Sequence, residues 1–473
     1  MKTRELKRRF INISMATLLG FLMGLADAQS EDSDRPQPNI VFILADDVGI
    51  GDVACYGGAL IKTPNIDKLA EQGLRFTQAY SGGPVCTPSR SALMTGLHGG
   101  HGPARDNVPH YKTYLDKDDT TMAEVLGGAG YRCGGFGKWS LGDAGTIGRA
   151  TAKGFDEWFG YLNQDHAHYY YPEYLDDNEG RLELTGNTES REFYSHDLIV
   201  DRSLDFIRRN SGGPFFAYCA FTLPHFSARS EDPDRLAVPD LGSYATKDWD
   251  LKSKKYAAMV ERLDRDVGRI VDLVDELGIS DQTLVIFTSD NGGHSEMSGR
   301  FDSNGPLRGF KSDVFEGGIR VPFIARWPGM IPAGETSDAI LTFWDMLPTF
   351  AELAGADKPS RLDGTSVVDA LMGGAVKMPH EYLYWDYGHC RDRYDQAVRM
   401  GKWKGIRLGV GSPLQLYDLE SDIAERHDLA QKHPEIAQRI ESIMHTAVEP
   451  HDRYPVGSRY RGKPIWKKSL PKN

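Results

Sequence analysis

A cysteine stands four residues before an arginine in the stretch PVCTPSRSALMTG, residues 84–96. Thr87 is a good N-cap residue, and the proline that follows it suits the first position of a helix. We therefore expect a short helix that ends at Gly96, with Cys86 just outside its N-terminus. The free N–H groups and the dipole at that end favour an anion, and the guanidinium of Arg90 can bind two oxygens of a tetrahedral oxyanion.

Cys86 itself has more than one interpretation. Most free cysteines are small buried hydrophobic residues. A thiol at a helix N-terminus can also be a catalytic nucleophile, because that end of the helix stabilises the thiolate. The chain has five cysteines and no C-x-x-C pair: Cys55, Cys86, Cys133, Cys219 and Cys390. Even if export permits disulfides, an odd number leaves one cysteine for another purpose, and Cys86 is the candidate.

Further polar side chains follow runs of apolar residues that are typical of buried strands. These runs are NIVFILADD (39–47), GYRCGGFGKW (130–139), GPFFAYCAFTLPH (213–225) and QTLVIFTSDNGGH (282–294). The polar residues at their ends are Asp46, Asp47, Lys138, His225, Asp290 and Asn291. A single aspartate in such a place is usually a turn or helix-cap residue. Four strands that end this way indicate a shared site, because open parallel sheets bind ligands beyond the carboxyl ends of their strands.

The oxygen-bearing members of this set indicate a metal site. Asp46, Asp47, Asp290 and Asn291 offer carboxylate and amide oxygens, with no thiolate and little imidazole. Such ligands suit a hard cation, either Ca²⁺ or Mg²⁺. The loop DDVGIGD that begins at Asp46 lacks the ligand spacing of an EF-hand, so we reject that interpretation.

Segments of helical periodicity lie between these strand runs. They cover residues 63–73, 120–130, 195–210 and 253–278. Continuous apolar strands that alternate with helices predict an α/β fold with a large, mostly parallel sheet sandwiched by helices. In such a sheet the polar ends of the strands share one edge.

The pattern changes near residue 372. Short runs typical of antiparallel strands follow at 381–388, 396–408 and 414–422, and one helical segment follows at 433–450. We therefore predict a catalytic domain over 39–372. A smaller C-terminal α+β subdomain, made of an antiparallel sheet plus a helix, and an irregular tail should occupy 373–473.

The ends and the charge of the chain limit its location and partners. The chain has 473 residues and a formal net charge of −12, which argues against a nucleic-acid partner but leaves room for a local anion site.

Residues 1–28 combine a basic start, an apolar run and the small-residue site ADA, as in a signal peptide, so we expect export to the periplasm or beyond. A membrane anchor is the alternative, although the run is short for one, and no other stretch could span a membrane. Residues 29–38 are typical of a disordered lead-in.

The motif CTPSR followed by ALMTG resembles the signature of the formylglycine-dependent (type I) sulfatases, which belong to the alkaline-phosphatase-like superfamily. The resemblance covers nearly the whole mature chain. Its other motifs are NIVFILADDVGIGD, GKWSLG (137–142), TLPH (222–225), TSDNGGH, LRGFKSDVFEGGIRVPF (307–323) and QLYDLESDIAERHDLA (415–430).

The resemblance implies a reaction and a role for each motif. A formylglycine-generating enzyme reads the C-x-P-x-R core and oxidises Cys86 to an aldehyde, whose hydrate attacks sulfur. One Ca²⁺ ion is bound by Asp46, Asp47, Asp290, Asn291 and the modified Cys86. Sulfate oxygens and the developing charge are neutralised by Arg90, Lys138 and Lys311. His225 binds sulfate or protonates the leaving alcohol.

The chain departs from the family pattern at two positions. Ser140 stands where the family often has the histidine that serves as the base for collapse of the hydrate, and Thr222 replaces another histidine. Another imidazole, water or Lys138 must then take this role. The candidate histidines are His98, His101, His166, His168 and His294, among which His168 is favoured.

The segment NQDHAHYYYPEYLDDN (163–178) bears on the substrate. Aromatic rings beside hydrogen-bonding groups suit a sugar, so we expect a sulfated carbohydrate with His168 as a contact residue, whereas a solvated loop is the simpler interpretation. One alternative function is a phosphohydrolase of the same superfamily, although Asn291 stands where such enzymes place a zinc-binding imidazole. The other is a catalytically silent glycan-binding homologue.

Overall fold

Strand β1 (Asn39–Ala45) lies in the middle of the large sheet, and all seven of its residues are buried. It pairs in parallel with β7 (Phe215–Ala220) on one side and with β8 (Thr283–Ser289) on the other. The computed structural model describes residues 37–107, 114–374, 378–389, 391 and 393–456. Within that part of the chain, the strand predicted at 39–47 is confirmed and ends at Ala45, directly before the two aspartates.

The large sheet has ten strands in the order β10-β2-β9-β8-β1-β7-β3-β4-β5-β6. The block from β8 to β4 is parallel throughout, whereas β9, β5 and β6 run antiparallel to their neighbours. The remaining strands are β2 (Leu74–Tyr80), β3 (Arg132–Lys138), β4 (Glu157–Tyr161), β5 (Tyr174–Asp177), β6 (Gly180–Glu183), β9 (Phe323–Arg326) and β10 (Glu335–Thr342). The prediction of a mostly parallel sheet is confirmed.

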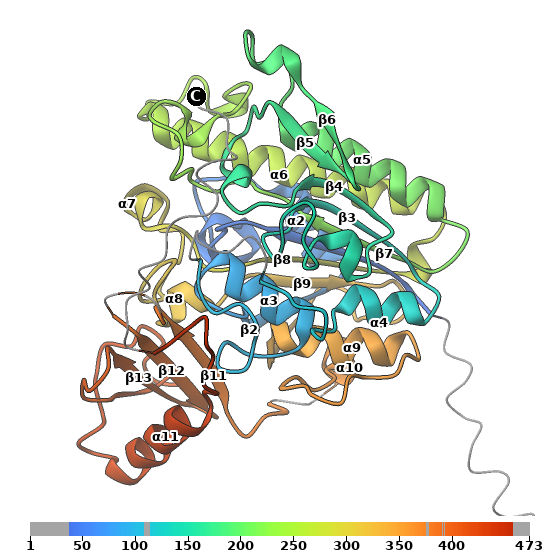
Figure 1. Cartoon of the computed structure of the whole chain (residues 1–473). Coiled ribbons are helices and arrows are strands. Elements are labelled where there is room, and N and C mark those ends of the chain that lie inside the picture. The colour runs from blue at the N-terminus through green and yellow to red at the C-terminus, as the bar shows by residue number, and fades with distance from the viewer. Residues whose placement is uncertain (1–36, 108–113, 375–377, 390, 392, 457–473) are drawn as a thin grey trace, which may run out of the picture. The chain divides into compact units, whose positions relative to one another are not determined.

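Helices cover both faces of this sheet, as predicted (Figure 1). Alternate residues of β1 show the two faces, because Phe42 packs into one hydrophobic core and Ile43 into the other. The first core includes α3 (Cys86–Thr95), α4 (Met122–Gly128), α9 (Met346–Leu353) and α10 (Val368–Leu371). The second includes α2 (Pro64–Glu71), α5 (Ser195–Asn210) and α6 (Leu251–Glu276).

The helix boundaries follow local signals. α5 has the bounds expected from its periodicity. α6 begins two residues earlier than expected, because Asp250 is its N-cap and accepts a 2.9 Å hydrogen bond from the Ser253 N–H group. Two short helices, α7 (Ser298–Phe301) and α8 (Glu316–Ile319), lie in the connections after β8.

The C-terminal sheet is antiparallel, with the order β11-β12-β13-β14. Its strands are β11 (Leu383–Tyr387), β12 (Asp395–Met400), β13 (Trp403–Leu408) and β14 (Gln415–Asp418). The run 396–408 is therefore two strands, joined by a turn in which Gly401 has a left-handed φ of 58°. One face of this sheet packs against α11 (Pro434–Thr446), and the other packs against Tyr80 and Trp344 of the large domain.

The described residues from Pro38 onward form one unit. The predicted signal peptide, most of the predicted lead-in and the tail from residue 457 lie outside the described residues. Among the residues that are described, no helix combines the length and the apolar character needed to cross a membrane. Export of the chain stays a prediction.

Candidate active site

Cys86 is the first residue of α3 and not, as expected, a residue outside it. The N-cap is Val85 in an extended conformation, so the prediction that Thr87 caps the helix is wrong. The Thr87 N–H group instead donates to Oδ1 of Asn107 over 2.9 Å. The C-terminal signal was correct, because Gly96 is left-handed with a φ of 69° and donates to the Ala92 carbonyl. All ten residues of α3 are buried, so groups from elsewhere in the fold satisfy the start of the helix.

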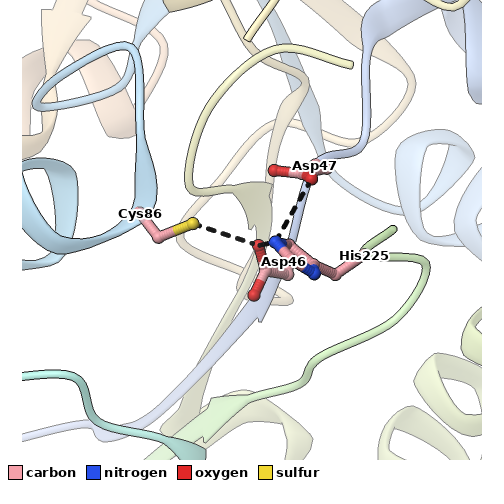
Figure 2. Close-up of side chains that lie close together, drawn as sticks. All are labelled: Asp46, Asp47, Cys86 and His225. Carbon is pink, nitrogen blue, oxygen red and sulfur yellow. Dashed lines mark hydrogen bonds and ion pairs between the residues drawn. The ribbon is translucent and has the colours of Figure 1, made fainter. Parts of the chain in front are cut away.

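The two aspartates after β1 face the same site. In an extended strand consecutive side chains point to opposite faces, but Asp47 has a left-handed φ of 70°, which reorients its side chain. Asp46 Oδ1 lies 3.5 Å from the Sγ atom of Cys86. One potential ligand atom from each of Asp46, Asp47, Cys86 and His225 lies within 4.8 Å of the others (Figure 2). The end of β1, the start of α3 and the segment after β7 therefore meet at one point.

The residues after β8 complete this group. Asp290 Oδ1 accepts a 3.3 Å hydrogen bond from the Asp47 N–H group, and Nδ2 of Asn291 donates to Asp47 Oδ1 over 2.7 Å. Oδ1 of Asn291 is buried and has no hydrogen-bond partner in the structure. A buried acceptor without a partner beside three carboxylates fits a hard divalent cation, which takes oxygen ligands.

Arg90 contacts other protein groups of this site. Its side chain is fully buried, and both Nε and Nη2 bind Oδ2 of Asp290, over 3.0 and 2.8 Å. Nη1 donates to the carbonyl of Lys138 over 2.8 Å. The guanidinium therefore holds Asp290 and β3 in place, whereas we had expected it to bind the oxygens of an anion directly.

Two lysines contact the aspartates. Lys138, at the end of β3, lies 2.7 Å from Oδ2 of Asp46, and Lys311 lies 2.8 Å from Oδ2 of Asp47. With Arg90 they balance the three carboxylates. Burial alone would raise the pKa of Asp46, but Lys138 and Arg90 lower it to about 2. A bound divalent cation would make the cluster positive, which suits a sulfate group.

The Cys86 side chain is a neutral thiol in this environment and not a reactive thiolate. It is fully buried, and burial together with the neighbouring Asp46 raises its pKa to about 12. Reactive cysteines have lowered pKa values, so the interpretation of Cys86 as an unmodified catalytic thiol is disfavoured.

His225 lies in the segment after β7 and contacts the other residues of the site. Its Nε2 atom lies 2.9 Å from Nζ of Lys311, and its backbone carbonyl accepts a hydrogen bond from the Tyr170 hydroxyl. The ring of His168 lies 4.6 Å from that of His225, measured between centroids. Burial, and next to it the lysine charges, holds the pKa of both imidazoles well below the usual value, so both rings are neutral.

Among the candidate replacements for the missing histidine, His168 is the one that the structure brings against His225. His98 and His101 lie beyond the far end of α3, where both contact Asp363. The ring of His166 packs against Tyr161 and Tyr174, and that of His294 packs against Phe226. Ser140 itself is buried, and its hydroxyl has no partner in the structure.

Two contacts at the start of α3 were missed by sequence reasoning. Asn107 binds the Thr87 backbone, and Gln164 accepts a 3.3 Å hydrogen bond from the Thr87 hydroxyl. Gln164 lies directly after Asn163 within the aromatic segment that we assigned to the substrate, so composition indicated the segment but not this contact.

Comparison with known proteins identifies the family. The sulfatase family model matches residues 38–356, and the model described as N-sulphoglucosamine sulphohydrolase, C-terminal, matches residues 310–451. The chain belongs to the sulfatase family. This confirms the resemblance to the formylglycine-dependent sulfatases and makes the chain a sulfuric ester hydrolase, with the motif residues gathered at one edge of the sheet.

Individual relatives agree with this assignment. The sulfatase is 34% identical to an arylsulfatase of Hemicentrotus pulcherrimus, over 85% of this chain and 76% of the relative. It is also 34% identical to an N-acetylgalactosamine-6-sulfatase of Canis lupus familiaris, over 83% of this chain and 76% of the relative. The crystal structure of Ps i-CgsB in complex with k-i-k-neocarrahexaose matches with a TM-score of 0.77 and 29% identity, over 91% of this chain and 97% of that one.

Proposed function

We propose that the sulfatase hydrolyses a sulfate ester on a sulfated carbohydrate, with a formylglycine made from Cys86 and one Ca²⁺ ion. The observation that supports this best is the placement of Cys86. Its sulfur lies 3.5 Å from Asp46, at the N-terminus of α3, and the partners of the two aspartates include Lys138, Lys311 and His225. Conversion of the thiol to a hydrated aldehyde would place a hydroxyl nucleophile at that point.

The protein groups around residue 86 support attack on sulfur. The hydrated aldehyde supplies one hydroxyl that attacks sulfur and a second that allows sulfate to leave by cleavage of a C–O bond. Lys138 and Lys311 neutralise charge on the sulfate oxygens as it develops. Nε2 of His225 accepts a hydrogen bond from Lys311, so this pair is placed to deliver a proton to the leaving alcohol.

The metal ligands in this proposal are Asp46, Asp47, Asp290, Asn291 and the modified residue 86. The ion would supply Lewis-acid polarisation of the oxygens bound to it. Asn291 contributes through the oxygen that now has no partner, and Arg90 keeps Asp290 oriented. Oxygen ligands without a histidine pair favour Ca²⁺ over the zinc ions of the alternative phosphohydrolase.

A carbohydrate substrate is supported by the aromatic segment. Tyr170 bonds to His225 through its hydroxyl, and its neighbours Tyr169 and Tyr171 line a cavity of about 260 Å³ together with Arg191. Aromatic faces beside polar groups suit a sugar ring, and the guanidinium of Arg191 in this cavity is paired with Asp234. Relatives include a structure in complex with a carrageenan oligosaccharide, k-i-k-neocarrahexaose.

Turnover of defined sulfated sugars tests the proposal. The chain would be produced together with a formylglycine-generating enzyme and assayed for released sulfate on sulfated galactose-type oligosaccharides, glycosaminoglycan disaccharides and an aryl sulfate. We expect release from at least one carbohydrate and none from the Cys86→Ala control. Binding of the sugars without release would favour the silent glycan-binding alternative, and release of phosphate from phosphate esters would favour the phosphohydrolase.

A further inference from the structure

The loop that carries Lys311 is held by contacts with two other segments and by a hydrogen bond within the loop. The Lys311 N–H group donates to the carbonyl of Gly293, just after the metal ligands of β8, over 3.1 Å. The Ser312 N–H group donates to the carbonyl of Pro84, two residues before Cys86, over 2.8 Å. The Gly317 N–H group donates to the Arg308 carbonyl over 2.7 Å and closes the loop. The position of Lys311 therefore depends on how residues 308–317 are held.

A buried charged cluster holds one end of this loop. Lys404, on β13 of the C-terminal sheet, places Nζ 2.8 Å from Oε1 of Glu316 and 2.9 Å from Oε1 of Glu425. All three side chains are fully buried. Glu425 also accepts a 2.8 Å hydrogen bond through Oε2 from the backbone N–H group of Glu316, at the start of α8.

The same C-terminal segment holds the other end of the loop. Arg308 donates from Nη1 to the backbone carbonyl of Glu425 over 2.7 Å and to the hydroxyl of Tyr417 over 3.1 Å. Its guanidinium also lies 3.9 Å from the centroid of the Phe315 ring. Glu425 therefore binds the loop at both of its ends, once through its side chain and once through its backbone.

We propose that Lys404 and Glu425 are positioning residues for catalysis, which set the place of Lys311 in the sulfate site by clamping the 308–317 loop. Neither residue touches the reacting groups. The inference rests on the proposed function because it assigns Lys311 to the sulfate group.

Burial explains why this clamp is rigid. Removing one partner of a buried ion pair leaves an uncompensated charge, which is strongly unfavourable, so loss of Lys404 would leave the buried carboxylate of Glu425 without its cation. Glu316 keeps two other partners, because the Tyr80 hydroxyl and Nη1 of Arg320 both donate to its Oε2 atom, over 2.7 and 3.3 Å. Without Lys404 the lowest-energy response is displacement of the loop, with Lys311 on it.

The variant Lys404→Met tests this, because methionine keeps the length of the side chain and removes the charge. We expect kcat to fall by about 10²-fold, the scale on which a misplacement of about 1 Å acts. The inhibition constant of inorganic sulfate should rise by about tenfold, because Lys311 no longer faces the anion. The matched control is Lys402→Met, two residues earlier, where a half-exposed lysine pairs with Asp418. That variant should keep both constants within about twofold.

Two further measurements separate positioning from general destabilisation. Hydrogen exchange in Lys404→Met should become faster at the amides of residues 308–317, with the strands of the large sheet unchanged. The double variant Lys404→Met/Glu425→Gln also removes the charge of Glu425, the carboxylate left without its cation, and keeps the acceptor for the Glu316 N–H group. It should regain part of the lost kcat and of the sulfate affinity.

Several results would overturn the proposal. These are unchanged kcat and sulfate inhibition in a folded Lys404→Met protein, or faster exchange spread evenly over the chain. If Lys404→Met does not fold, the conservative variants Lys404→Arg and Glu425→Gln take its place. In these variants we again expect a lower kcat, weaker inhibition by sulfate and faster exchange in residues 308–317, and the same contrary results would overturn the proposal. Hydrogen exchange needs no turnover, so it tests the clamp even if no sulfate ester is hydrolysed by the parent protein.

Discussion

Lys311 donates to Nε2 of His225 over 2.9 Å while its ammonium also lies 2.8 Å from a carboxylate oxygen of Asp47. One cation thus joins a carboxylate of the proposed metal site to the imidazole that we propose as a proton donor to the leaving alcohol. Because Nε2 of His225 accepts this hydrogen bond, the neutral imidazole carries its proton on Nδ1.

Replacing Lys311 should impair the reaction more than the binding of the sugar. In Lys311→Met we expect kcat/KM to fall by about 10²–10³-fold, the range found when one stabilising donor is removed from an active site. Steady-state kinetics on the best carbohydrate substrate measures this. Lys68→Met, a change to a half-exposed lysine paired with Asp272, is the control and should have wild-type constants. Equal constants for both variants would show that Lys311 does not act on sulfate.

Replacing Arg90 should weaken the metal site. Arg90→Lys keeps the charge but loses the two-pronged contact with Oδ2 of Asp290, which orients that ligand. We expect Ca²⁺ affinity to fall by about 10–100-fold, as for other groups that orient metal ligands. Calorimetric titration of the metal-free protein with Ca²⁺ measures the affinity independently of turnover. Retention of the parent affinity would mean that Asp290 is held by other contacts or is not a ligand.

The modification of Cys86 can be observed directly. Mass spectrometry of the peptide that contains Cys86, from a host with the modifying enzyme, should show the aldehyde in place of the thiol. Cys86→Ser should give no turnover, because a sulfated serine has no second hydroxyl on the same carbon through which sulfate could be expelled. Fully active protein with only thiol at this position would contradict the mechanism.

The ring of His168 packs against that of His225, so we propose that His168 takes over from the family histidine at Ser140. We expect His168→Ala to slow release of sulfate from the covalent intermediate more than its formation, so that sulfated enzyme accumulates in a burst experiment. His101→Ala, which changes a histidine paired with Asp363 beyond the far end of α3, is the control and should show no burst. If both variants turn over like the parent, His168 does not perform this step.

Asp52 should make stability depend on pH. Burial raises its pKa to about 7, although hydrogen bonds from Tyr256, Ser303 and Gly49 act in the opposite direction. The folded state then holds a proton that the unfolded state releases near its ordinary pKa of about 4. The free energy of unfolding should therefore decrease as the pH rises from about 4 to 7 and level off above that range.

Asp52→Asn checks this prediction, because the amide does not titrate. Chemical denaturation at several pH values should show a smaller decrease in the variant than in the parent over the same range. Identical pH dependence in both proteins would show that Asp52 is ionised when folded.

Much of the fold was accessible from the sequence because its strands are buried on both faces. Continuous apolar runs such as that of β1 and the 3.6-residue period of α5 leave little ambiguity, and both elements were predicted within two residues. The antiparallel strands at the edges were harder to predict. β5 lies inside the aromatic segment we considered a loop, because Tyr174–Asp177 pair with neighbouring strands although their apolar content is low.

The sequence predicted which residues form the site better than it predicted the contacts between them. Strand ends brought Asp46, Lys138, His225 and Asp290 together, as parallel topology requires. The partner of Arg90 was not predictable, because a guanidinium at a helix N-terminus can face an anion or a buried carboxylate equally well. The clamp on the Lys311 loop was also invisible, since Lys404 and Glu425 lie 93 and 114 residues after Lys311 and each resembles an ordinary surface charge in the sequence.

The complete burial of α3 bears on whether a modification of Cys86 can follow folding or must precede it. Cys86 has no exposed surface, and the residues through Arg90 that a modifying enzyme would read are buried as well. A modifying enzyme cannot bind this segment in the folded protein, because α3 would first have to unfold from the core. The oxidation of Cys86 that we propose would therefore come before folding, while the segment is still accessible, and a molecule that folds first would keep its thiol.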